Sequence, residues 1–274
     1  MSTSPFTPVD SKSQPDISGS TLIIPSISIG NIPQLTVDLL IHTYSLTKIG
    51  YLDDLYLYPF AGPIDYATSN SHPESGISHA IEVYYSQKFN LTVIQQRSPI
   101  IPTYTLPFVQ QVLFPFITTH FEHVFVLNSS DAGLVESVKS GDVKLYDTED
   151  LISSNLKNLS LASSSSLAES SDSKFGAGGA GEADKDSKFV TELVKSIISY
   201  NGESSSNSIG IQVLVSYVYE GDNFYDAEKL ASTLQEALQL HKSQSVHSWV
   251  KPVSWLGAYG DKSVPNAMEE GIFG

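Results

Sequence analysis

Two groups of residues in this sequence have types and spacing that could support metal or cofactor binding. His120 and His123 form an H-x-x-H pair, and imidazole is a common ligand of Zn²⁺. Gly176 to Gly181 fits the pattern G-x-G-x-x-G, whose glycines let a backbone approach a dinucleotide phosphate. The histidine pair lacks a suitably spaced third ligand, and a serine-rich run precedes the glycines where a strand would be required. We therefore predict no metal site and no cofactor.

Other polar residues could belong to a catalytic site or could simply hold the fold together. Ser28 and Asp38 would form a triad only with a histidine whose position the sequence does not give. Glu220, Asp222 and Asn223 follow an apolar run and precede a helical pattern, where α/β proteins place ligand-binding groups or helix caps. We favour capping by Asp222 or Asn223, and we predict no catalytic residues.

The stretch over 21–51 organises the elements that position these residues. Residues 22–29 are rich in β-branched side chains and carry no charge, which is typical of a strand covered on both faces. Gly30 ends this run, and Asn31 with Gln34 forms a capping-box-like pair at the start of a helix. The helix is too apolar for a surface helix, so we expect it to pack on the sheet and on a second surface.

The rest of the chain alternates between strand and helix patterns. The predicted strands are 55–60, 80–86, 91–96, 123–127 and 209–219. The predicted helices are 104–120, 189–200 and 226–238. Residues 80–86 and 91–96 should form a hairpin, Pro115 should kink or shorten its helix, and Trp249 and Trp255 should anchor the C-terminal segment to the core. This alternation predicts an α/β fold with a mixed β-sheet layered with helices.

Low-complexity sequence divides this fold. Residues 153–188 are rich in Ser, Gly and Ala with mixed charges, and such a segment buries too little apolar surface to offset its ordering entropy. We predict a disordered insertion there, within a single α/β domain over 21–260. A disordered tail over 1–20 should precede the domain, and a C-terminal tail over 261–274 should follow it.

The composition limits the kinds of partner. A formal net charge of −15 argues against binding nucleic acid or an anionic membrane, whereas a cationic protein partner would fit. The absence of cysteine excludes disulfides and thiolate chemistry, and the polar N-terminus lacks a signal-peptide pattern. No apolar run is long enough to span a bilayer. We expect a cytoplasmic or nuclear protein.

Three motifs carry a resemblance to a known family. The first is PSISIGNIPQLTVDLLIHT with KIGY, the second is EGDN with Asp226-Ala227, and the third combines Pro252, Ser254-Trp255 and residues 257–260. In this order and spacing they resemble the proteasome assembly chaperone 2 family, particularly its fungal members. The resemblance covers both ends of the chain but not 134–187. It implies a sheet flanked by helices, similar to that of nucleoside phosphorylases.

The resemblance also implies a function. Members of this family are chaperones for assembly of the 20S proteasome. As a heterodimer with proteasome assembly chaperone 1, they lie on the α ring, promote correct ring formation and block premature activator binding. The C-terminal residues Ile272, Phe273 and Gly274 are similar to the hydrophobic–tyrosine–any tail that enters pockets between α subunits, with Phe273 in place of tyrosine. The terminal carboxylate would pair there with a lysine. These three residues are the proteasome-binding site that we predict.

Two other functions remain open on the sequence. A phosphorylase-like, nucleotide-binding enzyme would share the fold, and a deep polar pocket near Asn31 and Glu220 would support it. A non-catalytic adaptor would instead use the serine-rich insertion for regulatory phosphorylation.

Overall fold

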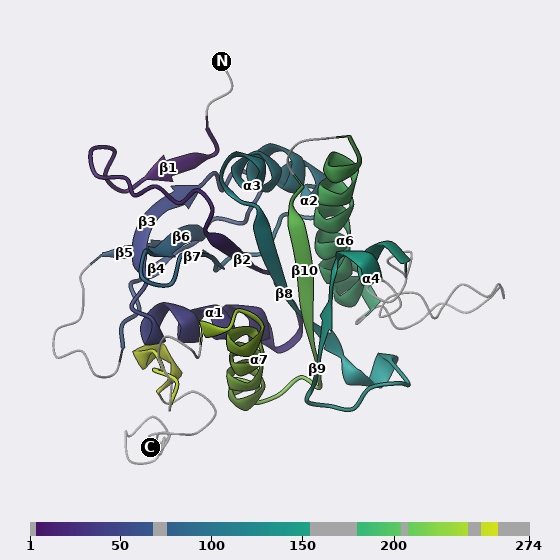
Figure 1. Ribbon diagram of the computed structural model, residues 1–274. Helices are drawn as coiled ribbons and strands as arrows, with labels where there is room; N and C mark the ends of the chain where they lie inside the picture. Colours follow the sequence, from purple (N-terminus) through teal and green to yellow (C-terminus); the bar gives the residue numbers. More distant parts are fainter. Residues whose placement is uncertain (1–3, 68–75, 154–179, 204–207, 241–247, 257–274) are drawn as a thin grey trace, which may run out of the picture.

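The protein is an α/β sandwich, shown in Figure 1 as a computed structural model that describes every residue except 1–3, 68–75, 154–179, 204–207, 241–247 and 257–274. The strands are β1 Phe6–Pro8, β2 Thr21–Pro25, β3 Thr47–Leu52, β4 Ala61–Pro63, β5 Ile77–His79, β6 Ile81–Ser86, β7 Leu91–Gln96, β8 His123–Asp131, β9 Asp142–Tyr146 and β10 Gly210–Val218. The α-helices are α1 Ile32–Thr43, α2 Thr105–Phe108, α3 Phe114–His120, α4 Thr148–Ser153, α6 Ala180–Glu203 and α7 Phe224–Ala237. The shorter helical segments are η1 Ile29–Asn31, η2 Val109–Leu113, η3 Ala132–Leu134 and η5 Val253–Trp255.

An eight-stranded mixed sheet forms the centre, in the order β1-β3-β6-β7-β2-β8-β10-β9. The central strands β7, β2, β8 and β10 are parallel to one another. The strands β1, β3, β6 and β9 join antiparallel on the two sides, and β6 with β7 forms the predicted hairpin. A separate small sheet consists of β4 and β5. The predicted mixed α/β fold is therefore confirmed.

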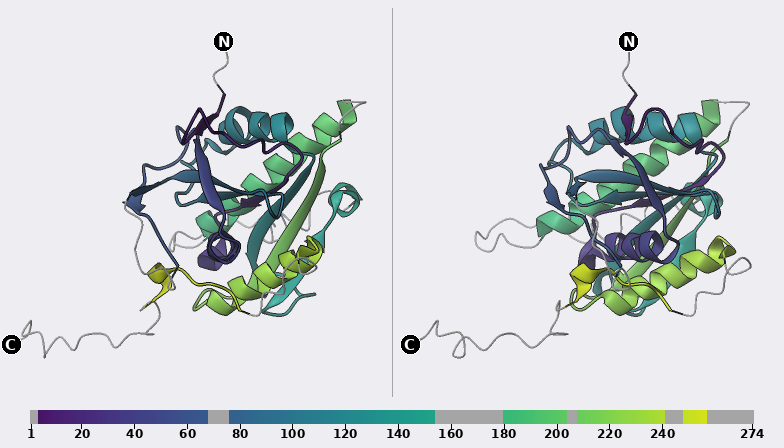
Figure 2. Two further views of the ribbon diagram at one scale, coloured as in Figure 1. Left: turned by 60° about the vertical axis from the view of Figure 1, so that its left-hand side comes forward. Right: turned by 90° about the vertical axis from the view of Figure 1, so that its left-hand side faces the viewer.

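Helices cover both faces of the central sheet (Figure 2). α1 and α7 cover one face, where Ile23 of β2 is buried, while α2, η2, α3 and α6 cover the other, where Leu22 and Ile24 are buried. β2 is thus covered on both sides, as its uncharged sequence predicts. α1 also packs against α7, and the Thr36 hydroxyl donates to the carbonyl of Ala227 at 3.1 Å. No helix in the described part of the chain is long and apolar enough to cross a bilayer.

The N-terminal residues differ from the predicted disordered tail over 1–20. Phe6–Pro8 pairs with β3 as β1, and Phe6 and Ile17 are buried. The Phe6 ring stacks on Phe116 with centroids 5.5 Å apart. It occupies the space above Gly50, where a Cβ would lie 2.4 Å from Phe6 Cε2. The prediction is wrong because two apolar anchors order a segment whose average composition is polar.

The strand predicted over 55–60 is also wrong. This segment makes a turn and one isolated bridge, between Leu57 and Ile100. It is otherwise joined to residues 99–101 by isolated backbone hydrogen bonds. One of these runs from the amide of Tyr58 to the carbonyl of Pro99 at 3.1 Å. Pro59 and Pro99 have no N–H, so the pairing cannot extend into a ladder.

The helix predicted over 104–120 is continuous but irregular. It runs from α2 through η2, a π-helical segment, into α3. Pro115 lies in the first turn of α3. Because proline lacks an N–H and its ring collides with the preceding turn, the widened turn directly before it accommodates the misfit. The predicted distortion is confirmed, although the helix does not end early.

The strand predicted over 123–127 is too short, and the insertion predicted over 153–188 is too long. β8 continues to Asp131, so Asn128 and Ser129 belong to the strand and not to a loop, because β10 supplies a parallel partner along its whole length. α6 begins at Ala180, inside the range predicted as a disordered insertion, and its later residues Phe189 to Ile197 bury the predicted apolar face. A helix anchored by such a face propagates into neighbouring residues. Residues 154–179 lie outside the described part of the chain.

Candidate functional site

Buried hydroxyl and amide groups gather where β2 and β8 end. The Ser26 hydroxyl donates to Asn128 Oδ1 at 2.6 Å, and Ser28 Oγ lies 2.8 Å from Ser129 Oγ. Ser129 contributes a second link, since its amide donates to Ser28 Oγ at 3.0 Å. Ser28 is therefore saturated by neighbouring hydroxyls and amides, which is the arrangement of a structural hydroxyl and not of an activated nucleophile. The sequence flags Ser28 but not Asn128, because only the parallel pairing of the two strands brings them together.

A glycine turn joins β2 to α1 and meets the loop that precedes α7. Gly30 has φ +67°, and a Cβ placed on it would lie 2.5 Å from Asn223 Oδ1. The Asn223 side chain accepts from the amide of Gly221 at 3.0 Å and donates to the carbonyl of Tyr219 at 2.9 Å. Two of the sequence motifs, distant along the chain, thus pack directly on each other.

The predicted helix caps are partly right. Asp222 Oδ1 accepts from the amide of Phe224, the first residue of α7, at 3.3 Å, so capping by Asp222 is confirmed. Asn223 stands at the N-cap position but uses its side chain within the loop. The capping box of Asn31 and Gln34 is wrong. Asn31 is left-handed with φ 49° and makes no side-chain cap bond, and the Gln34 amide donates to the carbonyl of Ser26 at 2.9 Å.

Asp38 of α1 forms a buried ion pair that holds the helix on the sheet. Its Oδ2 and Oδ1 accept from the two terminal nitrogens of Arg97 at 2.9 and 2.7 Å. Oδ1 also accepts from Gln95 Nε2 at 2.6 Å. A bidentate guanidinium and a buried amide occupy Oδ1 twice and Oδ2 once, which is the arrangement of a structural ion pair. Arg97 and Gln95 are not among the residues predicted from the sequence, although a polar run at the end of an apolar strand is a usable signal.

The two histidines of the H-x-x-H pair have separate environments. His120 lies between the rings of Phe116 and Phe121, with centroid distances of 5.5 and 5.9 Å. Burial lowers the pKa of His120, and the nearby carboxylate of Asp16 opposes this change only in part. His123 is exposed at the start of β8. Within the described residues, no group of three His, Cys, Asp or Glu side chains could hold a metal ion.

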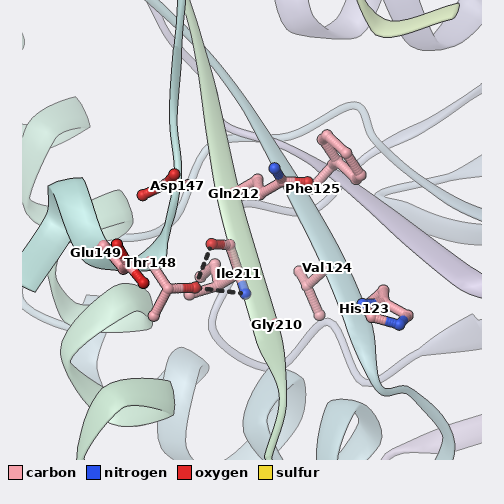
Figure 3. Close-up of a pocket in the computed structure, with 9 residues that line it drawn as sticks. All are labelled: His123, Val124, Phe125, Asp147, Thr148, Glu149, Gly210, Ile211 and Gln212. Carbon is pink, nitrogen blue, oxygen red and sulfur yellow. Dashed lines mark hydrogen bonds between the residues drawn. The ribbon is translucent and has the colours of Figure 1, made fainter. Parts of the chain in front are cut away.

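A cavity of about 380 Å³ opens at the amino ends of β8 and β10 (Figure 3). On one side the Thr148 hydroxyl donates to the carbonyl of Ile211 at 2.9 Å and so satisfies the edge of β10 where β9 has ended. Asp147 and Glu149 also line this side and are exposed, and His123 stands across the strands from them (Figure 3). This cavity is at the opposite end of the strands from Gly30, so it is not the polar pocket that would support a nucleotide-binding enzyme.

The C-terminal segment is anchored as predicted. The ring of Trp255 is buried and stacks on Phe224 with centroids 4.3 Å apart. Trp249 meets Tyr44 edge-on and donates from Nε1 to Ser232 Oγ at 3.2 Å. The segment therefore lies against α1 and α7, as the last coloured part of the chain in Figure 2 shows. The predicted binding residues Ile272, Phe273 and Gly274 lie outside the described residues.

These features define an α/β domain in which the motif residues lock loops and helices onto a mixed sheet. Residues 22–241 match the PAC2 family, and the chain belongs to this family. It is 30% identical over 278 residues to human proteasome assembly chaperone 2, with 93% of this chain and 97% of that protein covered. It is 25% identical to proteasome assembly chaperone 2 of Saccharomyces cerevisiae, over 88% of this chain and 95% of that protein. The resemblance found in the three motifs is confirmed.

A solved structure shares the fold. Pyrococcus furiosus PbaA, described as an archaeal homolog of proteasome-assembly chaperone, superposes with a TM-score of 0.51 at 14% identity, covering 86% of this chain and 82% of that one. At this level of identity, the comparison supports the sheet and its helical layers.

Proposed function

We propose that this chain is a non-enzymatic chaperone for assembly of the 20S proteasome. The observation that carries the proposal is the similarity to human proteasome assembly chaperone 2 over 93% of this chain and 97% of that protein. A similarity that spans nearly the whole length of both chains reaches beyond a shared fold. The internal hydrogen bonding of Ser28 and Asp38 accords with a structural and not a catalytic use of these side chains.

The proposed mechanism is templating and shielding. The chain pairs with proteasome assembly chaperone 1, and the heterodimer lies on the α ring, promotes correct ring formation and blocks premature activator binding. It acts in the cytoplasm and nucleus, where proteasomes assemble. Two weak tails on one heterodimer strengthen each other through effective concentration.

The C-terminal tail is the proposed contact with the α subunits. Trp255 stacks on Phe224 of α7 directly before Leu256, the last described residue, and 18 residues, 257–274, follow, the last 14 of which are the predicted tail. Fully extended, they reach at most about 60 Å, at roughly 3.3 Å per residue. Burial of Ile272 and Phe273 would contribute roughly 1.5–3 kcal/mol each, and the Gly274 carboxylate would orient the tail against a lysine.

Binding to purified 20S core particle tests this proposal. Deleting Ile272 to Gly274 should weaken binding of the heterodimer, and adding one residue after Gly274 should weaken it as well, because the carboxylate is displaced. Phe273→Tyr should bind at least as tightly, since a hydroxyl adds a hydrogen bond of about 1 kcal/mol. Native mass spectrometry should show an unchanged heterodimer in every variant. Equal affinity for the wild type, the truncation and the extension would remove the tail from the mechanism.

A further inference from the structure

Residues 249–256, which we call the C-terminal strap, are the last described part of the chain and lie against α1 and α7 (Figure 2). The amide of Val250 donates to Thr43 Oγ1, at the end of α1, at 2.9 Å. Lys251 Nζ lies 2.7 Å from Glu228 Oε1 of α7. These contacts fix the first half of the strap to both helices.

A loop carboxylate holds the second half of the strap. Asp65 Oδ1 accepts from the amide of Ser254 at 3.2 Å, and Asp65 Oδ2 accepts from the Ser254 hydroxyl. The amide of Val253 donates to the carbonyl of Tyr66 at 2.9 Å. Asp65 therefore binds the chain two residues before its last described residue, close to the point where the tail leaves the domain.

The Asp65 carboxylate lies in the field of a fixed positive charge. Burial acts to lower the pKa of the Arg97 guanidinium, but the carboxylates of Asp38 and Asp65 act in the opposite direction, and the pKa is raised. Arg97 is held in place by its bidentate pair with Asp38 of α1. Through Asp65 and Ser254, the strap is thus linked to an ion pair that joins α1 to the end of β7.

We propose that Asp65 is the positioning residue that fixes the point at which the C-terminal tail leaves the folded domain. The inference rests on the proposed function, in which residues 272–274 bind the α ring, and it adds the residue that sets the span of the tail. The effective concentration of a tethered end falls roughly as the −3/2 power of the length of its free chain. Release of the strap would lengthen that chain from the 18 residues of 257–274 to the 26 residues of 249–274.

The state of the strap can be measured directly. Both tryptophans of the chain, Trp249 and Trp255, lie in the strap, so tryptophan fluorescence of the isolated chain reports on this segment alone. Trp255 is 5% exposed and stacks on Phe224. Asp65→Ala should increase quenching of this fluorescence by acrylamide, because the loss of both bonds to Ser254 lets the end of the strap open.

Asp53→Ala is the matched control. Asp53 is an exposed loop residue whose Oδ1 accepts from the amide of Leu55 at 3.0 Å. The control removes the same charge and a similar loop hydrogen bond, but no contact with the strap. It should leave the quenching and the binding of core particle as in the wild type.

Binding to purified 20S core particle separates positioning from stability. Affinity is measured at fixed salt for heterodimers that carry the wild-type chain, Asp65→Ala, the deletion of 272–274, or both changes. Asp65→Ala should weaken binding about twofold in the full chain, as the longer free chain requires, and should have no effect once 272–274 are deleted. A purely structural role of Asp65 would weaken binding equally in both backgrounds.

A reversible cross-link provides the rescue. Asp65→Cys combined with Ser254→Cys joins two side chains that are in direct contact, in a chain that has no other cysteine. The oxidised form should bind core particle as the wild type does, and the reduced form should bind as weakly as Asp65→Ala.

The outcomes distinguish this inference from the proposed function. If deletion of 272–274 weakens binding but Asp65→Ala changes neither the quenching nor the affinity, the positioning role is overturned and the tail contact stands. Equal affinities of the oxidised and reduced forms of the cross-linked variant overturn the positioning role as well. A deletion of 272–274 without effect overturns both the positioning role and the tail contact.

Discussion

Replacing Gly30 by alanine should destabilise the fold through two separate effects. A left-handed backbone costs an L-residue about 1–2 kcal/mol, and Gly30 has φ +67°. The new Cβ would also lie 2.5 Å from Oδ1 and 2.8 Å from Cγ of the buried Asn223 side chain. Asn223 could move only by breaking bonds to Gly221, Tyr219 or Asp226, at about 1 kcal/mol for each bond. The expected total loss is about 2–4 kcal/mol of unfolding free energy.

Gly19→Ala is the matched control. Gly19 has φ +72°, and a Cβ on it meets nothing within 4 Å, so this variant carries only the backbone cost. Urea unfolding followed by circular dichroism gives both free energies. In a chain of this size, a loss of about 3 kcal/mol lowers Tm by roughly 6–12 °C.

An Asn223→Ala background separates the steric cost from the backbone cost. In an Asn223→Ala background the Gly30→Ala change should cost only the backbone part, because the amide that collides with the new Cβ is gone. Equal losses for Gly30→Ala and Gly19→Ala, within about 0.5 kcal/mol, the usual limit of additivity, would refute a steric contribution from Asn223.

Three further changes test other parts of the structure. Asp38→Asn should cost about 2–4 kcal/mol in urea unfolding, because it leaves the Arg97 charge without its carboxylate, while Glu192→Gln at a surface pair should cost below about 1 kcal/mol. Burial raises the pKa of Tyr44 to about 12 from 10.0, so the unfolded chain loses this proton first and stability should fall as pH rises from 10 to 12. Tyr44→Phe should reduce that slope, and an unchanged slope would contradict the assignment. Replacing residues 160–177 by a short Gly-Ser linker should shift Tm by less than about 2 °C, since loop closure depends weakly on length; a larger loss would show that the segment packs.

Local sequence patterns predicted most of the elements that frame the candidate site. The uncharged run of β2, the β6–β7 hairpin and the apolar stripe of α7 each contain their own signal, because periodicity directly reflects which face is buried. The anchoring role of Trp255 followed from the same logic, since a large aromatic side chain near a chain end rarely stays in water. The acidic turn before α7 was likewise interpreted correctly at Asp222.

The wrong predictions concern residues whose local sequence allows two arrangements. In each case a contact with a residue far away in sequence selects one of them. Gln34 has the spacing of a capping box, but the carbonyl of Ser26 lies closer to its amide in the folded chain. Phe6 stands in a polar segment and is ordered only because Gly50, on a neighbouring strand, leaves room for its ring. Such choices depend on contacts between residues far apart in sequence, which periodicity does not encode.

The sequence by itself determined the family, the α/β class and the acidic, cysteine-free character of the chain, because these depend on composition and on motifs read in order. Tertiary structure decided that Asp38 pairs with Arg97 and that Asn223 packs on Gly30. Each of these is a meeting of side chains from separate segments. Their partners are chosen by sheet order and by the space that neighbouring residues leave, and both exist only once the chain has folded.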